Sequence, residues 1–110
     1  MALRQRTGMN KTEKIAYEQL KTAGYLVERP RVSKWQPQDF FYCWDFIAID
    51  KSEIRFIQVS SKYFSQRARD DQERMLAFPH LHCTSKEYWR WDKKKEIFIV
   101  QKIGKEAETV

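Results

Sequence analysis

Cysteine is scarce in this chain, which has only Cys43 and Cys83 among its 110 residues. The two lack the Cys-x-x-Cys spacing of zinc and redox sites, so we expect buried free thiols at both positions. His80 and His82 lie close to Cys83, but no second pair of ligands matches them in the sequence. A zinc site is therefore not predicted.

Long apolar runs and repeats are also missing. No stretch approaches the roughly 18 apolar residues that indicate a membrane-spanning helix. The first ten residues, MALRQRTGMN, have a basic start without the apolar segment of a secretory signal. Internal repeats and low-complexity segments are absent as well. We expect a single cytoplasmic domain over residues 1–110, without a membrane partner.

Positive charge and aromatic side chains are abundant instead. The chain has 21 Lys and Arg residues against 15 Asp and Glu, which gives a formal net charge of +6. Such a balance favours polyanionic partners, above all nucleic acid. Aromatic residues make up 15% of the chain, and a domain of this size needs most of them for its core.

Apolar periodicity and turn signals predict seven elements. Asn10 is a candidate N-cap for the first helix, and Gly24 follows its last turn. The turn Asp-Lys-Ser-Glu at 50–53 connects two strands of a central antiparallel hairpin. Helices are predicted over 10–23 and 66–78, and strands over 25–29, 40–49, 54–60, 80–91 and 96–103. The order α, β, β, β, α, β, β predicts an α/β protein with a mixed central sheet flanked by helices.

Three polar side chains occupy positions where this pattern favours apolar ones. Asp45 lies within the apolar segment FYCWDFIAI, Gln58 lies in the next predicted strand, and Glu13 lies on the apolar stripe of the first helix. A buried carboxylate without a partner costs several kcal/mol. Together with the Val59 carbonyl, these oxygens suit a hard cation such as Mg²⁺. Such an ion polarises a phosphoryl oxygen and lowers the pKa of a bound water.

Each of the three residues also has a purely structural interpretation. Glu13 is the third residue after Asn10 and could complete a capping box. Asp45 could face solvent from an edge strand, and Gln58 could form hydrogen bonds on one face of the sheet. The sequence alone leaves these alternatives open.

With these residues and spacings, the chain resembles the PD-(D/E)xK nucleases over residues 10–103, and among them the small archaeal-type Holliday junction resolvases and their phage and plasmid relatives. The pattern of that family is a helix with a Glu, a loop with a Ser, a strand with an Asp after a Pro, and a second strand with (D/E/Q)-x-K. The resemblance assigns these places to Glu13, Ser33, Asp45 and Gln58.

Two positions depart from the family pattern. Trp44 stands where the family has the Pro before the Asp, and Ser60 stands where it has the Lys. A serine cannot provide the cationic group that offsets charge in the transition state. Lys62 lies on the same face of a strand as Ser60, about 7 Å further along, and is the candidate substitute.

The resemblance implies a restriction-endonuclease-like core and a Mg²⁺- or Mn²⁺-dependent endonuclease that acts on branched or duplex DNA as a homodimer. Residues 1–8 are expected to be a mobile basic arm, and residues 104–110 a frayed tail. Basic side chains on the arm and on the second helix would contact the DNA backbone, although they could equally form a solvated surface: Arg4, Arg6, Arg67, Arg69 and Arg74. The alternatives are a catalytically inactive DNA-binding module on the same fold and a small basic RNA-binding or assembly protein.

Overall fold

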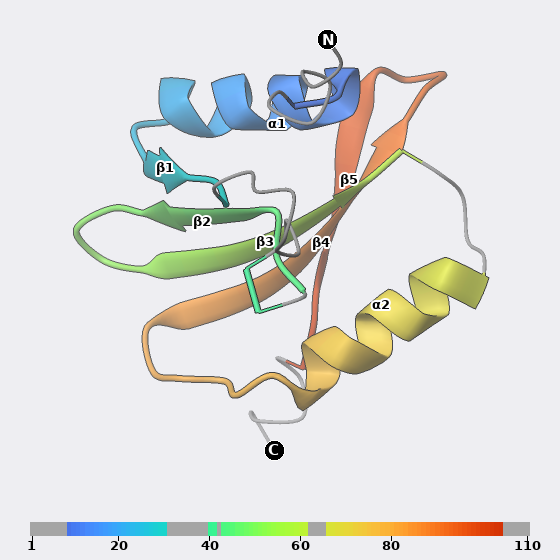
Figure 1. The fold of residues 1–110 in the computed structure, drawn as a ribbon. Coiled ribbons are helices and arrows are strands. Elements are labelled where there is room, and N and C mark those ends of the chain that lie inside the picture. Colours follow the sequence, from blue (N-terminus) through green and yellow to red (C-terminus); the bar gives the residue numbers. More distant parts are fainter. Residues whose placement is uncertain (1–8, 31–39, 42, 62–65, 105–110) are drawn as a thin grey trace, which may run out of the picture.

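The computed structural model describes residues 9–30, 40–41, 43–61 and 66–104. It contains a five-stranded mixed sheet and two helices, in the predicted order (Figure 1). The elements are α1 (Lys11–Thr22), β1 (Leu26–Glu28), β2 (Phe46–Ile49), β3 (Ile54–Ser60), α2 (Gln66–Ala77), β4 (Thr84–Asp92) and β5 (Ile97–Lys102). Nowhere in this described part does a helix have the length and apolar character needed to cross a membrane.

The strands lie side by side in the order in which they occur in the sequence, β1-β2-β3-β4-β5. Neighbouring strands are antiparallel except for β3 and β4, which are parallel. A parallel connection needs a crossover, and α2 provides it. Figure 1 shows α1 and α2 on opposite sides of the sheet.

The termini of α1 follow from local sequence signals. The side chain of Asn10 accepts a hydrogen bond from the Glu13 N–H at 2.8 Å, and the Glu13 carboxylate accepts one from the Asn10 N–H at 3.2 Å. At the other end, Gly24 has a φ of +101°, and the Tyr25 N–H donates to the Leu20 carbonyl at 3.1 Å. This arrangement is a Schellman motif, which a side chain at position 24 would strain.

Two apolar clusters fill the space between the sheet and its helices. Alternation along each strand sends successive side chains to opposite faces, so Ile57 packs beneath α1 whereas Phe56 packs beneath α2. The α1 cluster consists of Ala16, Leu20, Phe46, Ala48, Ile57, Val59 and Trp89. The α2 cluster consists of Cys43, Trp44, Met75, Tyr88 and Ile103.

A buried lysine connects α2 to the sheet. Lys86 of β4 is 2% exposed, and its Nζ donates to the carbonyl oxygens of Phe78 at 2.6 Å and Leu76 at 3.3 Å. The last carbonyls of a helix have no partner within the helix, and a cation is favourable at this end. Lys86 therefore provides a donor for the carbonyl groups at the end of α2. It holds this end of the helix against the face of the sheet that α2 covers, which we name the α2 face.

Two predicted strands begin several residues later than expected. β2 begins only at Phe46, because Trp44 forms an isolated bridge with Phe40, and Phe41 has a φ of +55°. The predicted strand over 80–91 begins only at Thr84, after Cys83, whose φ is +65°. A φ in this range is incompatible with a strand.

The prediction for the two cysteines is half correct. Neither cysteine forms a disulfide within the described residues, and Cys43 is buried as predicted, but Cys83 is exposed. The cause is the late start of β4, which leaves Cys83 in the turn before the strand.

The Glu87 carboxylate at the centre of β4 is fully buried and receives four hydrogen bonds. Arg55 of β3 donates from Nε at 2.9 Å and from Nη2 at 2.8 Å, Ser85 donates from Oγ at 2.6 Å, and Trp89 donates from Nε1 at 2.9 Å. Nζ of Lys102 in β5 lies 3.7 Å from Oε2 of Glu87. We name Glu87, Arg55, Ser85 and Trp89 the Glu87 network.

The charges of the Glu87 network stabilise each other against burial. Burial alone would lower the pKa of Arg55 and raise the pKa of Glu87. The hydrogen bonds and the attraction between the two outweigh this effect, so the pKa of Arg55 is raised and that of Glu87 is lowered. Both groups are therefore ionised in the folded protein near neutral pH.

Replacement of Glu87 by Gln should lower the free energy of unfolding by about 3 kcal/mol, because an amide has one acceptor oxygen for several donors and leaves Arg55 as an uncompensated buried charge. Urea unfolding at pH 7 measures the change. Glu18→Gln, the same substitution at an exposed residue of α1, is the control and should shift the value by less than about 0.5 kcal/mol. Equal stabilities of the two variants would contradict a central role for Glu87.

The Glu87 network should also make stability depend on pH. A carboxylate whose pKa is lowered on folding contributes stability above its unfolded pKa, near 4.5, and loses it as the pH falls through the folded value. The stability difference between wild type and Glu87→Gln should therefore be constant from pH 6 to 8 and shrink steadily below about pH 4.5. Urea titrations over this pH series test it. A difference that persists unchanged at low pH would show that ionisation of Glu87 does not contribute.

Candidate functional site

Asp45 lies immediately before β2, not in the middle of a strand as predicted. Its Oδ2 accepts a hydrogen bond from the Val59 N–H at 2.8 Å, and its own N–H donates to the Ile57 carbonyl at 2.8 Å. The Trp44 carbonyl accepts from the Phe40 N–H at 2.8 Å. Since that carbonyl is directed to Phe40, the Asp45 carboxylate takes its place as the acceptor for the Val59 N–H of β3.

Gln58 lies between the two residues that Asp45 contacts. It shares a face of β3 with Phe56, beneath α2, because side chains alternate along the strand. Its Oε1 is buried and has no hydrogen-bond partner within the described residues. The Asp45 carboxylate therefore binds the backbone next to Gln58, and a shared metal site of the two side chains stays a prediction.

A row of polar residues continues from Gln58 across the sheet. Gln58 is in register with Tyr88 of β4, and Tyr88 with Gln101 of β5. Gln101 accepts a hydrogen bond from Gln72 of α2 at 3.3 Å. We name Asp45, Gln58, Tyr88 and Gln101 the polar row.

Two buried polar atoms of the polar row, Gln58 Oε1 and the Tyr88 hydroxyl, have no hydrogen-bond partner among the described residues. The hydroxyl of Tyr88, a residue that is 3% exposed, has no hydrogen-bond partner among the described residues, and neither does Nε1 of the neighbouring, fully buried Trp44. A buried polar group without a partner costs about 1–3 kcal/mol. Together with Gln58 Oε1, these atoms mark a part of the α2 face where water, an ion or a ligand group would be stabilising.

Glu13 lies on the other side of the sheet from Gln58. Its carboxylate completes the capping box with Asn10, as the structural interpretation expected, and α1 packs on the face opposite Gln58. Within the described part of the chain, no three His, Cys, Asp or Glu side chains are grouped closely enough to hold a metal ion. A metal-binding role for Glu13 stays a prediction.

Several predicted site residues fall outside the described residues: Arg4, Arg6, Ser33 and Lys62. Arg67 lies in α2, and nothing is described of its side chain. Arg69 and Arg74 are exposed on α2, where Arg74 forms an ion pair with Asp71. Val59 is buried, and its N–H is the group that binds Asp45. A metal contact of its carbonyl stays a prediction.

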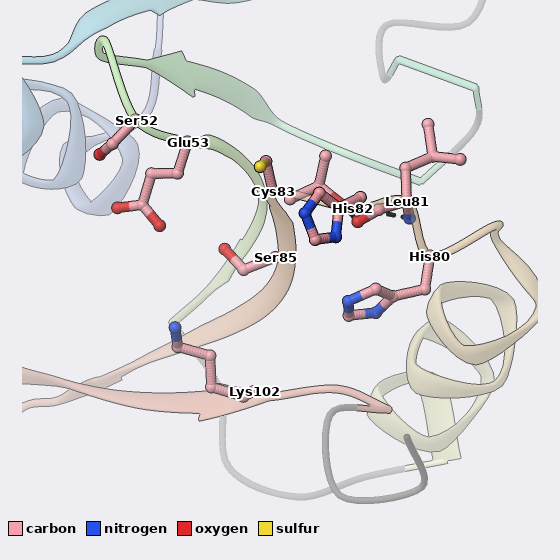
Figure 2. Close-up of a pocket in the computed structure, with 9 residues that line it drawn as sticks. Ser52, Glu53, His80, Leu81, His82, Cys83, Ser85 and Lys102 are labelled. Atoms are coloured by element: carbon pink, nitrogen blue, oxygen red, sulfur yellow. Dashed lines mark hydrogen bonds between the residues drawn. The ribbon is translucent and has the colours of Figure 1, made fainter. Parts of the chain in front are cut away.

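A second candidate site is an open pocket of about 600 Å³ at the other end of the sheet, where β3 and β4 begin. Figure 2 shows Glu53, His80, His82 and Lys102 around it. Tyr25 donates a hydrogen bond to Glu53 at 2.6 Å, which together with partial burial raises the pKa of Tyr25. That His80 and His82 form no zinc site stays a prediction.

No sequence signal singles out Tyr88 or Gln101. A tyrosine and a glutamine are ordinary strand residues, and their position beside Gln58 depends on the register of β3 with β4 and of β4 with β5. Such long-range pairing leaves no local signal. Comparison of the chain with protein-family models, with curated proteins and with solved structures finds no match.

The capping box makes a prediction for Glu13. Glu13→Gln should leave the free energy of unfolding within about 0.5 kcal/mol of wild type, because glutamine also suits this position, whereas Asn10→Ala should lower it by about 1 kcal/mol. Urea unfolding measures both. If Glu13 serves only as the cap of α1, Mn²⁺ affinity, measured by calorimetry, should be the same for Glu13→Gln as for wild type. An affinity reduced in that variant without a change in stability would place Glu13 among the metal ligands instead.

Proposed function

We propose that the chain is a metal-dependent DNA endonuclease that hydrolyses phosphodiester bonds, of the type represented by small Holliday junction resolvases. The main support is the Asp45 carboxylate, which accepts a hydrogen bond from the Val59 N–H. Val59 is next to Gln58, and the buried Oε1 of Gln58 has no partner among the described residues. The mixed sheet between two helices is compatible with the restriction-endonuclease-like core that the resemblance implies.

Asp45 and Gln58 suit a magnesium or manganese ion. Both offer hard oxygen atoms, and Mg²⁺ is usually held by one or two carboxylates while water completes its coordination shell. The bond from the Val59 N–H orients the Asp45 carboxylate, so little reorganisation would accompany binding. When bound, the ion would polarise a phosphoryl oxygen and provide an activated water. Glu13 is a possible third ligand only if it leaves the capping box.

DNA is the proposed substrate because of the excess of positive charge. The formal net charge of +6 favours a polyanion, and the exposed Arg69 and Arg74 on α2 could contact backbone phosphates. Contacts of this kind recognise the shape of DNA rather than its sequence. A homodimer, which would present two sites to two strands, is part of the proposal through the resemblance.

A second candidate is a catalytically inactive DNA-binding module on the same fold. Two observations favour it: Ser60 stands at the position of the motif lysine, and the Glu13 carboxylate is engaged in the capping box of α1. The two candidates differ in one measurable property, which is cleavage that depends on divalent metal.

Wild type should cleave at least one of four labelled substrates, four-way junction, flap, duplex or single strand, in Mg²⁺ or Mn²⁺ but not in EDTA. Asp45→Asn keeps an acceptor for the Val59 N–H and removes the charge, so it should fold normally and cleave at least about 100-fold more slowly. Gel assays of the initial rate measure this.

Asp92→Asn is the matched control, because Asp92 caps the turn before β5 with an acceptor that asparagine also has. It should cleave at the wild-type rate. Wild-type cleavage that survives Asp45→Asn would overturn the proposed site. Binding to DNA that weakens with salt, without cleavage of any substrate, would establish the inactive module.

A further inference from the structure

The register of β3 and β4 places an arginine beside the position where the family pattern has its lysine. Ser60, the last residue of β3, is in register with Arg90 of β4. Parallel neighbours lie about 4.8 Å apart and direct their side chains to the same face. Arg90 therefore stands next to Ser60 on the α2 face of the sheet.

Arg90 also stands next to the polar row. It is two residues from Tyr88 along β4, and Ser60 is two residues from Gln58 along β3, so all four side chains share one face. A strand advances about 6.6 Å in two residues, a distance within the reach of an arginine side chain. The guanidinium can thus extend along the sheet toward Gln58 on the neighbouring strand.

The exposure of Arg90 suits contact with a ligand. Arg90 is partly exposed, whereas Lys86 and Tyr88 on the same face of β4 are buried. Its neighbour across β5 is Ile99, which is 38% exposed and carries no charge. An arginine beside a partly exposed apolar residue offers the planar donor fork that binds phosphate in a bidentate manner.

We propose that Arg90 is the phosphate-binding cation of this site and binds a non-bridging oxygen of the DNA phosphodiester beside Asp45 and Gln58. The inference rests on the proposed function and deepens it. It assigns to β4 the positive charge that Ser60 does not provide on β3, and it makes Lys62 unnecessary for that role. Arg90 neither forms nor breaks a covalent bond. It holds the phosphodiester and offsets the charge that develops on it.

The test compares Arg90→Ala with Lys93→Ala. Lys93 is an exposed lysine in the turn between β4 and β5, so its variant removes the same charge from the same hairpin but outside the site. Arg90→Ala should lower the rate of metal-dependent cleavage by about 100-fold, and Lys93→Ala should leave it unchanged. Free guanidinium ion should restore part of the rate to Arg90→Ala and none to Asp45→Asn.

Arg90→Lys serves as a second variant if the alanine variant does not fold. It keeps the charge and the aliphatic stem but not the planar fork, and it should lose less rate than Arg90→Ala. A rate for Arg90→Ala or Arg90→Lys equal to that of wild type would overturn the inference. So would a full loss in Lys62→Ala with no loss in either Arg90 variant.

DNA binding in EDTA separates this inference from the proposed function. If wild type cleaves nothing, the proposed nuclease fails, but Arg90 can still be judged by fluorescence anisotropy with a labelled four-way junction. Arg90→Ala should bind about tenfold more weakly than Lys93→Ala, and its log Kd should depend less steeply on log salt, by about one unit. Equal affinities of the two variants would overturn the assignment of Arg90 to a phosphate.

Discussion

The buried carboxylate of Glu87 is the constraint on which the rest of the sheet depends. A charge in this position is tolerated only when donors surround it, and Arg55 supplies two of them from the neighbouring strand. A shift of β3 against β4 by one residue would move Arg55 to the other face and leave both charges buried without partners. The same register aligns Gln58 with Tyr88 and Ser60 with Arg90. An ion pair on the α1 face therefore determines which side chains meet on the α2 face.

The irregular chain before β2 is the second determinant of the candidate site. Trp44 is fully buried and packs against Phe56 and Phe78, with ring centroids 5.7 and 5.3 Å away. This packing fixes a bridged turn whose backbone carbonyl is directed away from β3. The Asp45 carboxylate fills the resulting gap at the Val59 N–H. One carboxylate oxygen thus has a structural use, and the same bond holds the group in a defined orientation.

Sequence reasoning succeeded where the signal is local. Asn10 and Gly24 mark the ends of α1 by their own hydrogen-bonding and backbone preferences, and β3 has the predicted bounds because turn residues precede an alternating apolar strand. It failed where tertiary packing overrides propensity. Phe41 and Cys83 adopt positive φ values that their residue types disfavour, so two strands begin later than their apolar composition indicated. The position of Asp45 opposite the backbone next to Gln58 could be predicted from a hairpin. The position of Arg90 beside Ser60 could not, because it depends on a parallel register across a helical crossover.

The two faces of the sheet differ in how completely their polar groups are satisfied. Glu87 receives four hydrogen bonds beneath α1, whereas Gln58 Oε1, the Tyr88 hydroxyl and Trp44 Nε1 have none within the described residues beneath α2. Each such atom costs about 1–3 kcal/mol, a large fraction of the stability of about 5–15 kcal/mol that is usual for a domain. Apolar residues of similar shape would remove that cost, so fold stability alone does not account for the polar row. Departures from good packing of this kind are typical of functional sites. A cation bound at Gln58 would supply the partner that its Oε1 lacks among the described residues.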